Sequence, residues 1–152
     1  MNGREDPKEN DLFFTCSLID YIARLTHNRR RDVVRLLGRE RIAKIYDLAD
    51  VYHSDNLDRV AEDFIEEANI GRGSFDNVSA CRYTVPSHWD IGKVYKRLIL
   101  GIVRHDGVDV TEALLRAYES PVSDLIDDYN KAFYYDAPGN ILNAYIYGGV
   151  EV

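Results

Sequence analysis

The sequence has little cysteine and no long hydrophobic run. Cys16 and Cys81 are its only cysteines, and two thiols without C-x-x-C spacing fit neither a zinc ribbon nor a disulfide framework. The longest strongly apolar run, residues 98–103, is far too short to span a bilayer. The polar N-terminus contains no hydrophobic region of the kind found in signal peptides. We therefore expect a cytoplasmic protein with reduced thiols and no membrane partner.

Recognisable catalytic motifs are also missing. The sequence contains no G-x-S-x-G nucleophile motif, and neither cysteine has a recognisable active-site setting. The stretch Gly71-Arg72-Gly73 lacks the Gly-Lys-Ser/Thr that completes a phosphate-binding loop, so it is more typical of a turn. We therefore predict no catalytic residue, no cofactor and no enzymatic activity.

Apolar residues are abundant enough for a packed core. Hydrophobic residues make up 45% of the 152-residue chain and charged residues 30%, which is typical of a globular domain rather than of a disordered chain. A chain of this length fits one domain. We expect a disordered lead over residues 1–9 and a single compact helical domain over residues 10–152.

The spacing of the apolar residues predicts a mainly α fold of about six to eight helices. From Asn10 onward, apolar positions recur every three or four residues, and no region is rich in strand patterns. In the first half we expect one helix from Asn10 to about His27, a short one from Asp32 to a stop at Gly38, one over residues 39–52, and one that begins at Ser54 or Asp55.

A long irregular connection is expected near residues 69–86, where two glycines, small polar residues and Pro86 interrupt the helical pattern. Within it, residues 80–85 could form a short extended piece. Beyond it we expect a long helix that begins at Ser87, one from Asp109 to Tyr118, one that begins at Ser120 and carries apolar residues as far as Phe133, and a last one around residues 141–145.

His88 and Asp90 flank Trp89, the only tryptophan, and have two interpretations. Ser87 and Asp90 have the spacing of a helix capping box, which explains the stretch as a helix start with Trp89 as an apolar anchor. Alternatively, His88 and Asp90 could join His53 and Asp55 in binding a divalent metal for a metal-dependent enzyme. Because the spacing matches no metal motif, we predict no metal site and keep the metal-dependent enzyme as an alternative.

Charge is unevenly distributed along a chain whose net charge is −7. Residues 24–44 contain eight arginines and lysines against two acidic residues, whereas residues 119–152 contain six acidic residues against one lysine. The cluster Arg29, Arg30 and Arg31 is therefore a candidate contact patch, and the stretch Arg29–Arg41 a candidate nucleic-acid-binding surface. The basic stretch could instead pair with the acidic end of the chain. Nucleic-acid binding stays the alternative, since the net charge opposes contact with phosphates.

The C-terminal segment is rich in tyrosine as well as acidic. Six of the eleven tyrosines lie between Tyr118 and Tyr147. Tyrosine is common at protein interfaces, although ordinary packing of small helices would also use some of these rings. We take the candidate partner-binding residues to be Tyr129, Tyr134, Tyr135, Asp136, Tyr145 and Tyr147. An acidic surface rich in tyrosine would suit a basic protein partner.

Four stretches together resemble a family of small uncharacterised bacterial proteins. They are NRRRDVVRLLG, IYDLADVYHSDNLDRV, YTVPSHWDIGKVYKRLI and SPVSDLIDDYNKAFYYDAPGNI, and the resemblance covers the chain from Leu12 onward. Members of that family are encoded beside proteins that look like ADP-ribosyltransferases, in a toxin–antitoxin-like arrangement. The resemblance supplies no catalytic motif. It implies a helical partner protein, with an ADP-ribosyltransferase-like protein as one candidate partner.

The sequence thus leads to one functional hypothesis with two alternatives. We expect a non-enzymatic protein-interaction module that is antitoxin-like, or accessory to a neighbouring enzyme, in a bacterial toxin–antitoxin or phage-conflict system. The first alternative is a nucleic-acid-binding helical protein that uses Arg29–Arg41. The second is the metal-dependent enzyme that uses His53, Asp55, His88 and Asp90.

Overall fold

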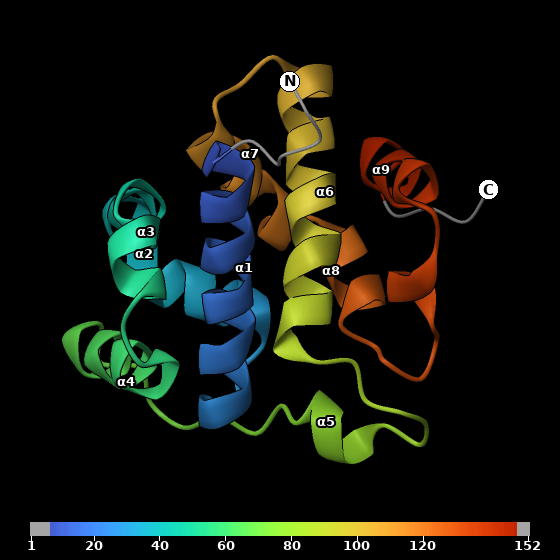
Figure 1. Ribbon diagram of the computed structural model, residues 1–152. Helices are drawn as coiled ribbons and strands as arrows, with labels where there is room; N and C mark the ends of the chain where they lie inside the picture. Colours follow the sequence, from blue (N-terminus) through green and yellow to red (C-terminus); the bar gives the residue numbers. More distant parts are fainter. Residues whose placement is uncertain (1–6, 149–152) are drawn as a thin grey trace.

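Two long helices form the centre of the fold. In the computed structural model, α1 (Pro7–Thr26) and α6 (His88–Asp106) lie side by side and run in opposite directions (Figure 1). Their backbones approach closely at Gly92, where an added Cβ would lie 2.9 Å from the backbone nitrogen of Ser17. A glycine is therefore required at this crossing. The structure describes residues 7–148.

Shorter helices surround this central pair, and α6 also packs on α7 and α9. They are α2 (Arg30–Asp47), α3 (Ala49–His53), α4 (Leu57–Glu67), α5 (Asn77–Ala80), α7 (Val110–Glu119), α8 (Pro121–Ile126), the 3-10 helix η1 (Phe133–Tyr135) and α9 (Pro138–Ile146). Residues 7–148 contain no strand. This confirms the prediction of a mainly α fold in a single domain.

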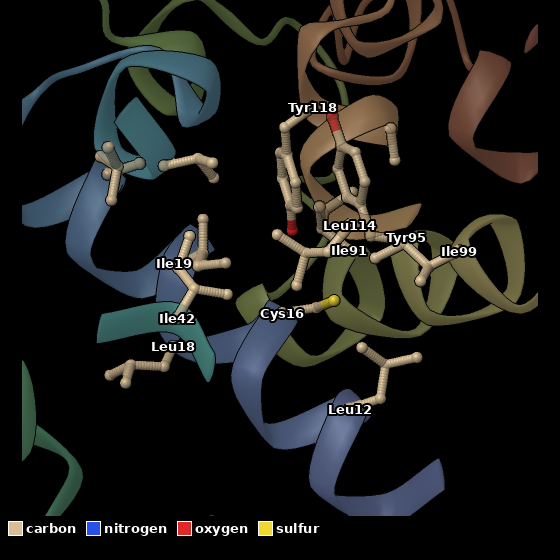
Figure 2. Close-up of a cluster of buried hydrophobic side chains, with 14 of the residues drawn as sticks. Leu12, Cys16, Leu18, Ile19, Ile42, Ile91, Tyr95, Ile99, Leu114 and Tyr118 are labelled. Carbon is tan, nitrogen blue, oxygen red and sulfur yellow. The ribbon is translucent and has the colours of Figure 1, made fainter. Parts of the chain in front are cut away.

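The core lies between α1, α6 and α7. The α1 stripe that the sequence predicted is buried, and it includes Leu12, Cys16 and Ile19 (Figure 2). The rings of Tyr95 and Tyr118 stack beside it, with centroids 4.1 Å apart and planes 12° apart. Burial raises the pKa of the Cys16 thiol to about 12, so this cysteine packs as a small apolar residue, as expected.

Local polar signals correctly predicted several helix ends. Ser87 and Asp90 form a reciprocal capping box at the start of α6. Asp109 accepts from the backbone N–H of Glu112 at 2.8 Å, and Ser120 caps α8 ahead of its proline. Gly38 has φ +81° and breaks the helical geometry of α2, which is where the sequence predicted a stop.

Other predicted boundaries were wrong. Residues 7–9 are helical instead of a disordered lead, and residues 1–6 lie outside the described part of the chain. The cap of α4 is Asn56, which accepts from Arg59, because the Asp55 carboxylate is turned to the N–H of Asn56. The expected helix over 39–52 breaks at Leu48.

In the second half of the chain, the structure differs from the sequence predictions in two places. Residues 77–80 form one helical turn, and the structure assigns no strand to residues 80–85. The helix that begins at Ser120 ends at Ile126 and does not continue to Phe133. The chain leaves helical geometry there, and Asp127 and Tyr129 turn inward to buried polar partners. None of the described helices is long and apolar enough to cross a membrane.

Candidate partner-binding surface

The structure separates the predicted contact tyrosines into buried and exposed residues. Tyr129 is only 3% exposed, so its place in the predicted contact surface is corrected. Tyr145 is half-buried and donates to Asp106 at 2.6 Å. Tyr134 is half-buried, whereas Tyr135 and Tyr147 are 82% and 61% exposed. Only some of the predicted surface is therefore open to a partner.

The three adjacent arginines also have different environments. Arg30 is fully buried, and its Nε donates to Asp20 at 2.7 Å, so it is removed from the predicted contact patch. Arg31 donates to the carbonyl oxygens of Tyr118 and Ser120 and to Asp124. Arg29 is exposed and lies over the ring of Phe75. Arg29–Arg31 therefore do not form one continuous basic patch.

A buried polar cluster replaces part of the predicted surface. Asp20 of α1 accepts from both Arg24 and Arg30 at 2.7 Å, and both arginines donate to the Tyr129 hydroxyl at 3.3 Å. Arg24 also donates to the carbonyl oxygen of Pro86 at 2.7 Å. This cluster ties three distant parts of the chain together. Its role is to fix the position of the segment that follows α8.

A second buried chain of polar groups lies beside it. The Tyr95 hydroxyl donates to Asp127 at 3.0 Å and lies 2.7 Å from the hydroxyl oxygen of Ser123. Asp127 is 4% exposed, and burial raises the pKa of its carboxyl to about 7. Because Tyr95 and Ser123 are closed off from solvent, this arrangement has the character of a core network.

The basic stretch pairs with the acidic end of the chain, which was one of the two interpretations of the charge pattern. Three arginines of α2 form ion pairs along the α7–α8 side: Arg31 with Asp124, Arg35 with Glu119 and Arg39 with Glu112. The Arg35 pair uses both carboxylate oxygens, at 2.6 and 2.7 Å. These pairs leave fewer guanidinium groups available to the phosphates that nucleic-acid binding would require.

The four residues of the metal alternative do not meet. Asp90 belongs to the capping box, His53 packs edge-on against Phe14, and the His88 ring lies against those of Tyr21 and Trp89. Burial and the Arg24 guanidinium lower the pKa of His88. Throughout residues 7–148, no group of three His, Cys, Asp or Glu side chains is arranged to hold a metal ion. The geometry therefore contradicts that ligand set.

A hollow of about 510 Å³ lies beside the buried Asp127. Three other carboxylates line it, but each already has local partners: Asp76 accepts from Ser79, Asp128 from Asn130, and Asp124 from Arg31. Each of these three carboxylates therefore already accepts a hydrogen bond within the fold.

The exposed Tyr135 borders a different hollow, of about 300 Å³, which we call the tyrosine groove. It is lined by residues 84–86, by Asp90, Lys93, Val94 and Arg97 of α6, and by residues 134–136. The Tyr134 ring packs edge-on against the ring of the buried Tyr129, with ring centroids 5.7 Å apart. The ring centroids of Tyr134 and Tyr135 lie 5.3 Å apart. The buried polar cluster therefore holds one wall of this groove in place.

Sequence reasoning found Tyr134, Tyr135 and Asp136 but missed the two cations of the groove, Lys93 and Arg97. Their spacing of four residues puts them on one face of α6, but only the fold shows that this face meets the tyrosines. No protein-family model, curated protein or solved structure matches the chain.

Proposed function

We propose that the protein is a non-enzymatic protein-interaction module of the bacterial cytoplasm. Its role is antitoxin-like, or accessory to a neighbouring enzyme, in a toxin–antitoxin or phage-conflict system, as the family resemblance implies. The observation that carries the proposal is the tyrosine groove, where Tyr135 is 82% exposed beside apolar and cationic side chains. Such a combination is typical of the residues that contribute most to binding between proteins.

The rigidity of the groove supports this role. Tyr134 lies against Tyr129, whose hydroxyl accepts from two arginines of the buried cluster. Pro86, which also lines the groove, is buried, and Arg24 donates to its carbonyl oxygen. A surface that is already ordered loses less conformational entropy on binding, so more of the contact energy appears as affinity.

The alternatives have less support. A nucleic-acid surface over Arg29–Arg41 would compete with the ion pairs to Asp124, Glu119 and Glu112. A metal-dependent enzyme would need ligands other than the four that the sequence suggested.

Co-expression with the neighbouring genes tests the proposal. Tagged wild-type protein should retain one stoichiometric partner, identified by mass spectrometry. Tyr135→Ala should reduce its recovery about tenfold or more, because a central interface tyrosine contributes well over 1 kcal/mol. Tyr147→Ala is the matched control: Tyr147 was predicted as a contact residue and is exposed, but it does not line the groove, so the proposed surface leaves it out.

Circular dichroism should show the same helix content in both variants. A wild-type protein that retains no partner, or a Tyr135→Ala variant that captures as much as wild type, would reject the proposal. Equal losses for Tyr135→Ala and Tyr147→Ala would also count against the groove.

A further inference from the structure

The tyrosine groove presents two cations that have no carboxylate partner within residues 7–148. Lys93 and Arg97 are exposed, lie one helical turn apart on α6, and form no ion pair there. Most other arginines of this acidic chain do reach a carboxylate. These are Arg24, Arg29, Arg30, Arg31, Arg35, Arg39, Arg41 and Arg116. Among the described basic side chains without a carboxylate partner, Lys93 and Arg97 are the two that line this groove.

The two carboxylates that line the groove are already engaged. Asp90 accepts from the backbone N–H of Ser87 at 2.9 Å and lies in the first turn of α6. Asp136 accepts from the N–H of Ala137 and the amide of Asn140, both at 3.1 Å, next to the start of α9. The positive end of a helix dipole offsets a carboxylate at each of these positions. Both carboxylates keep their charge, but they already accept hydrogen bonds within the fold, whereas Lys93 and Arg97 have no carboxylate partner among the described residues and can pair with one from a ligand.

Apolar surface lies between these groups. Val85, Pro86 and Val94 line the same groove as the rings of Tyr134 and Tyr135. A purely ionic ligand would leave this surface uncovered, so the groove matches a ligand that has both carboxylates and an apolar or aromatic side chain.

We propose that the tyrosine groove binds an acidic peptide segment of the partner protein, with carboxylates at Lys93 and Arg97 and an apolar side chain against the tyrosines. This inference rests on the proposed interaction function and specifies the chemistry of the partner. It reverses the expectation of a basic partner. The reason is that part of the acidic surface expected over residues 119–152 is already used within the fold: Glu119 and Asp124 are paired with arginines of α2, and Asp127 is buried.

Nuclear magnetic resonance with a defined probe tests the inference. The probe is the capped peptide Glu-Glu-Phe-Glu-Leu-Glu, added to the ¹⁵N-labelled full chain. Backbone signals of residues 84–97 and 133–137 should shift. A peptide with lysine in place of every glutamate should leave these signals unchanged. Affinity for the acidic peptide should fall as salt is added, because the contacts are between exposed charges.

Charge-reversal variants locate the contact. Lys93→Glu and Arg97→Glu should each weaken peptide binding about fivefold or more. Arg104→Glu is the control, because Arg104 is an exposed arginine of the same helix that does not line the groove. Absence of shifts with the acidic peptide, an equal response to the lysine peptide, or an equal loss in Arg104→Glu would overturn the inference.

The same variants distinguish this inference from the proposed function. If Tyr135→Ala loses the co-expressed partner but Lys93→Glu and Arg97→Glu retain it, the interaction role stands and the acidic segment is rejected. If wild type captures no partner, the function itself fails. Nuclear magnetic resonance signals of the groove residues that shift with protein concentration alone would assign the groove to a second copy of the chain and would overturn a separate partner.

Discussion

Arg30 donates from Nε to Oδ1 of Asp20 at 2.7 Å, and both side chains are only 1% exposed. Arg29, the preceding residue, is exposed. Two adjacent arginines therefore have opposite roles, one inside the core and one on the surface. A buried ion pair is expensive to break because the remaining charge stays without its partner away from water.

We expect Arg30→Ala to lower the free energy of unfolding by about 3 kcal/mol or more. Arg29→Ala removes the same side chain from an exposed position, so its cost should be about 1 kcal/mol or less. Urea denaturation followed by circular dichroism measures both. Similar losses in the two variants would show that Arg30 is not held in a buried pair.

Asp127 should make stability depend on pH. Burial raises the pKa of its carboxyl from 3.8 to about 7, so the folded state binds this proton more tightly than the unfolded chain does. The stabilising contribution is therefore complete below pH 3.8 and is lost as the pH rises through about 7. The pKa change corresponds to at most about 4 kcal/mol.

Asp127→Asn should remove this pH dependence, because an amide can still accept from Tyr95 but does not ionise. Urea midpoints measured between about pH 5 and about pH 8 should change less in the variant than in wild type. Asp128→Asn, which removes a neighbouring carboxylate outside the Tyr95 hydrogen bond, controls for the loss of a negative charge. The same pH profile in wild type and Asp127→Asn would contradict the assignment.

Gly92 should tolerate no larger side chain. An added Cβ would meet the backbone of Ser17, which cannot move without separating α1 from α6. We expect Gly92→Ala to cost about 1–3 kcal/mol, a typical penalty for overpacking a core. Gly139→Ala is the control, because no atom lies within 4 Å of the added Cβ and alanine favours the helix. Thermal unfolding should show a lower Tm for the first variant only.

The paired arginines of α2 should make nucleic-acid binding weak. Fluorescence anisotropy with a labelled DNA duplex at low and physiological salt measures it. We expect no affinity with the steep salt dependence that several phosphate contacts produce. Steeply salt-dependent binding that Arg29→Ala and Arg31→Ala reduce would instead favour the nucleic-acid alternative.

The sequence predicted features that depend on a few neighbouring residues. The Ser87–Asp90 capping box was predicted correctly, since both partners lie within one turn. The break at Gly38 was also correct, because its φ of +81° suits glycine. The same local reasoning failed at Ser54 and Asp55, where several polar residues in a row could each have capped α4.

Features that depend on distant segments were not predictable in this way. The cluster of Asp20, Arg30 and Tyr129 needs three parts of the chain to meet, and no spacing in the sequence reveals it. Tyr129 was therefore placed with the exposed tyrosines. The sequence predicted only part of the tyrosine groove. It indicated Tyr134 and Tyr135 as contact residues, but not the residues of α6 that line the groove with them.

The antiparallel pairing of α1 with α6 also has a consequence for biosynthesis. Residues 7–26 are made first, yet the helix that they contact most comprises residues 88–106. A nascent chain that ends before α6 exposes the broad apolar stripe of α1 to solvent. Folding must therefore wait for a contact between residues far apart in the sequence, which slows it and leaves the incomplete chain prone to aggregation. Truncation before α6, which begins at His88, should yield an insoluble fragment instead of a smaller domain.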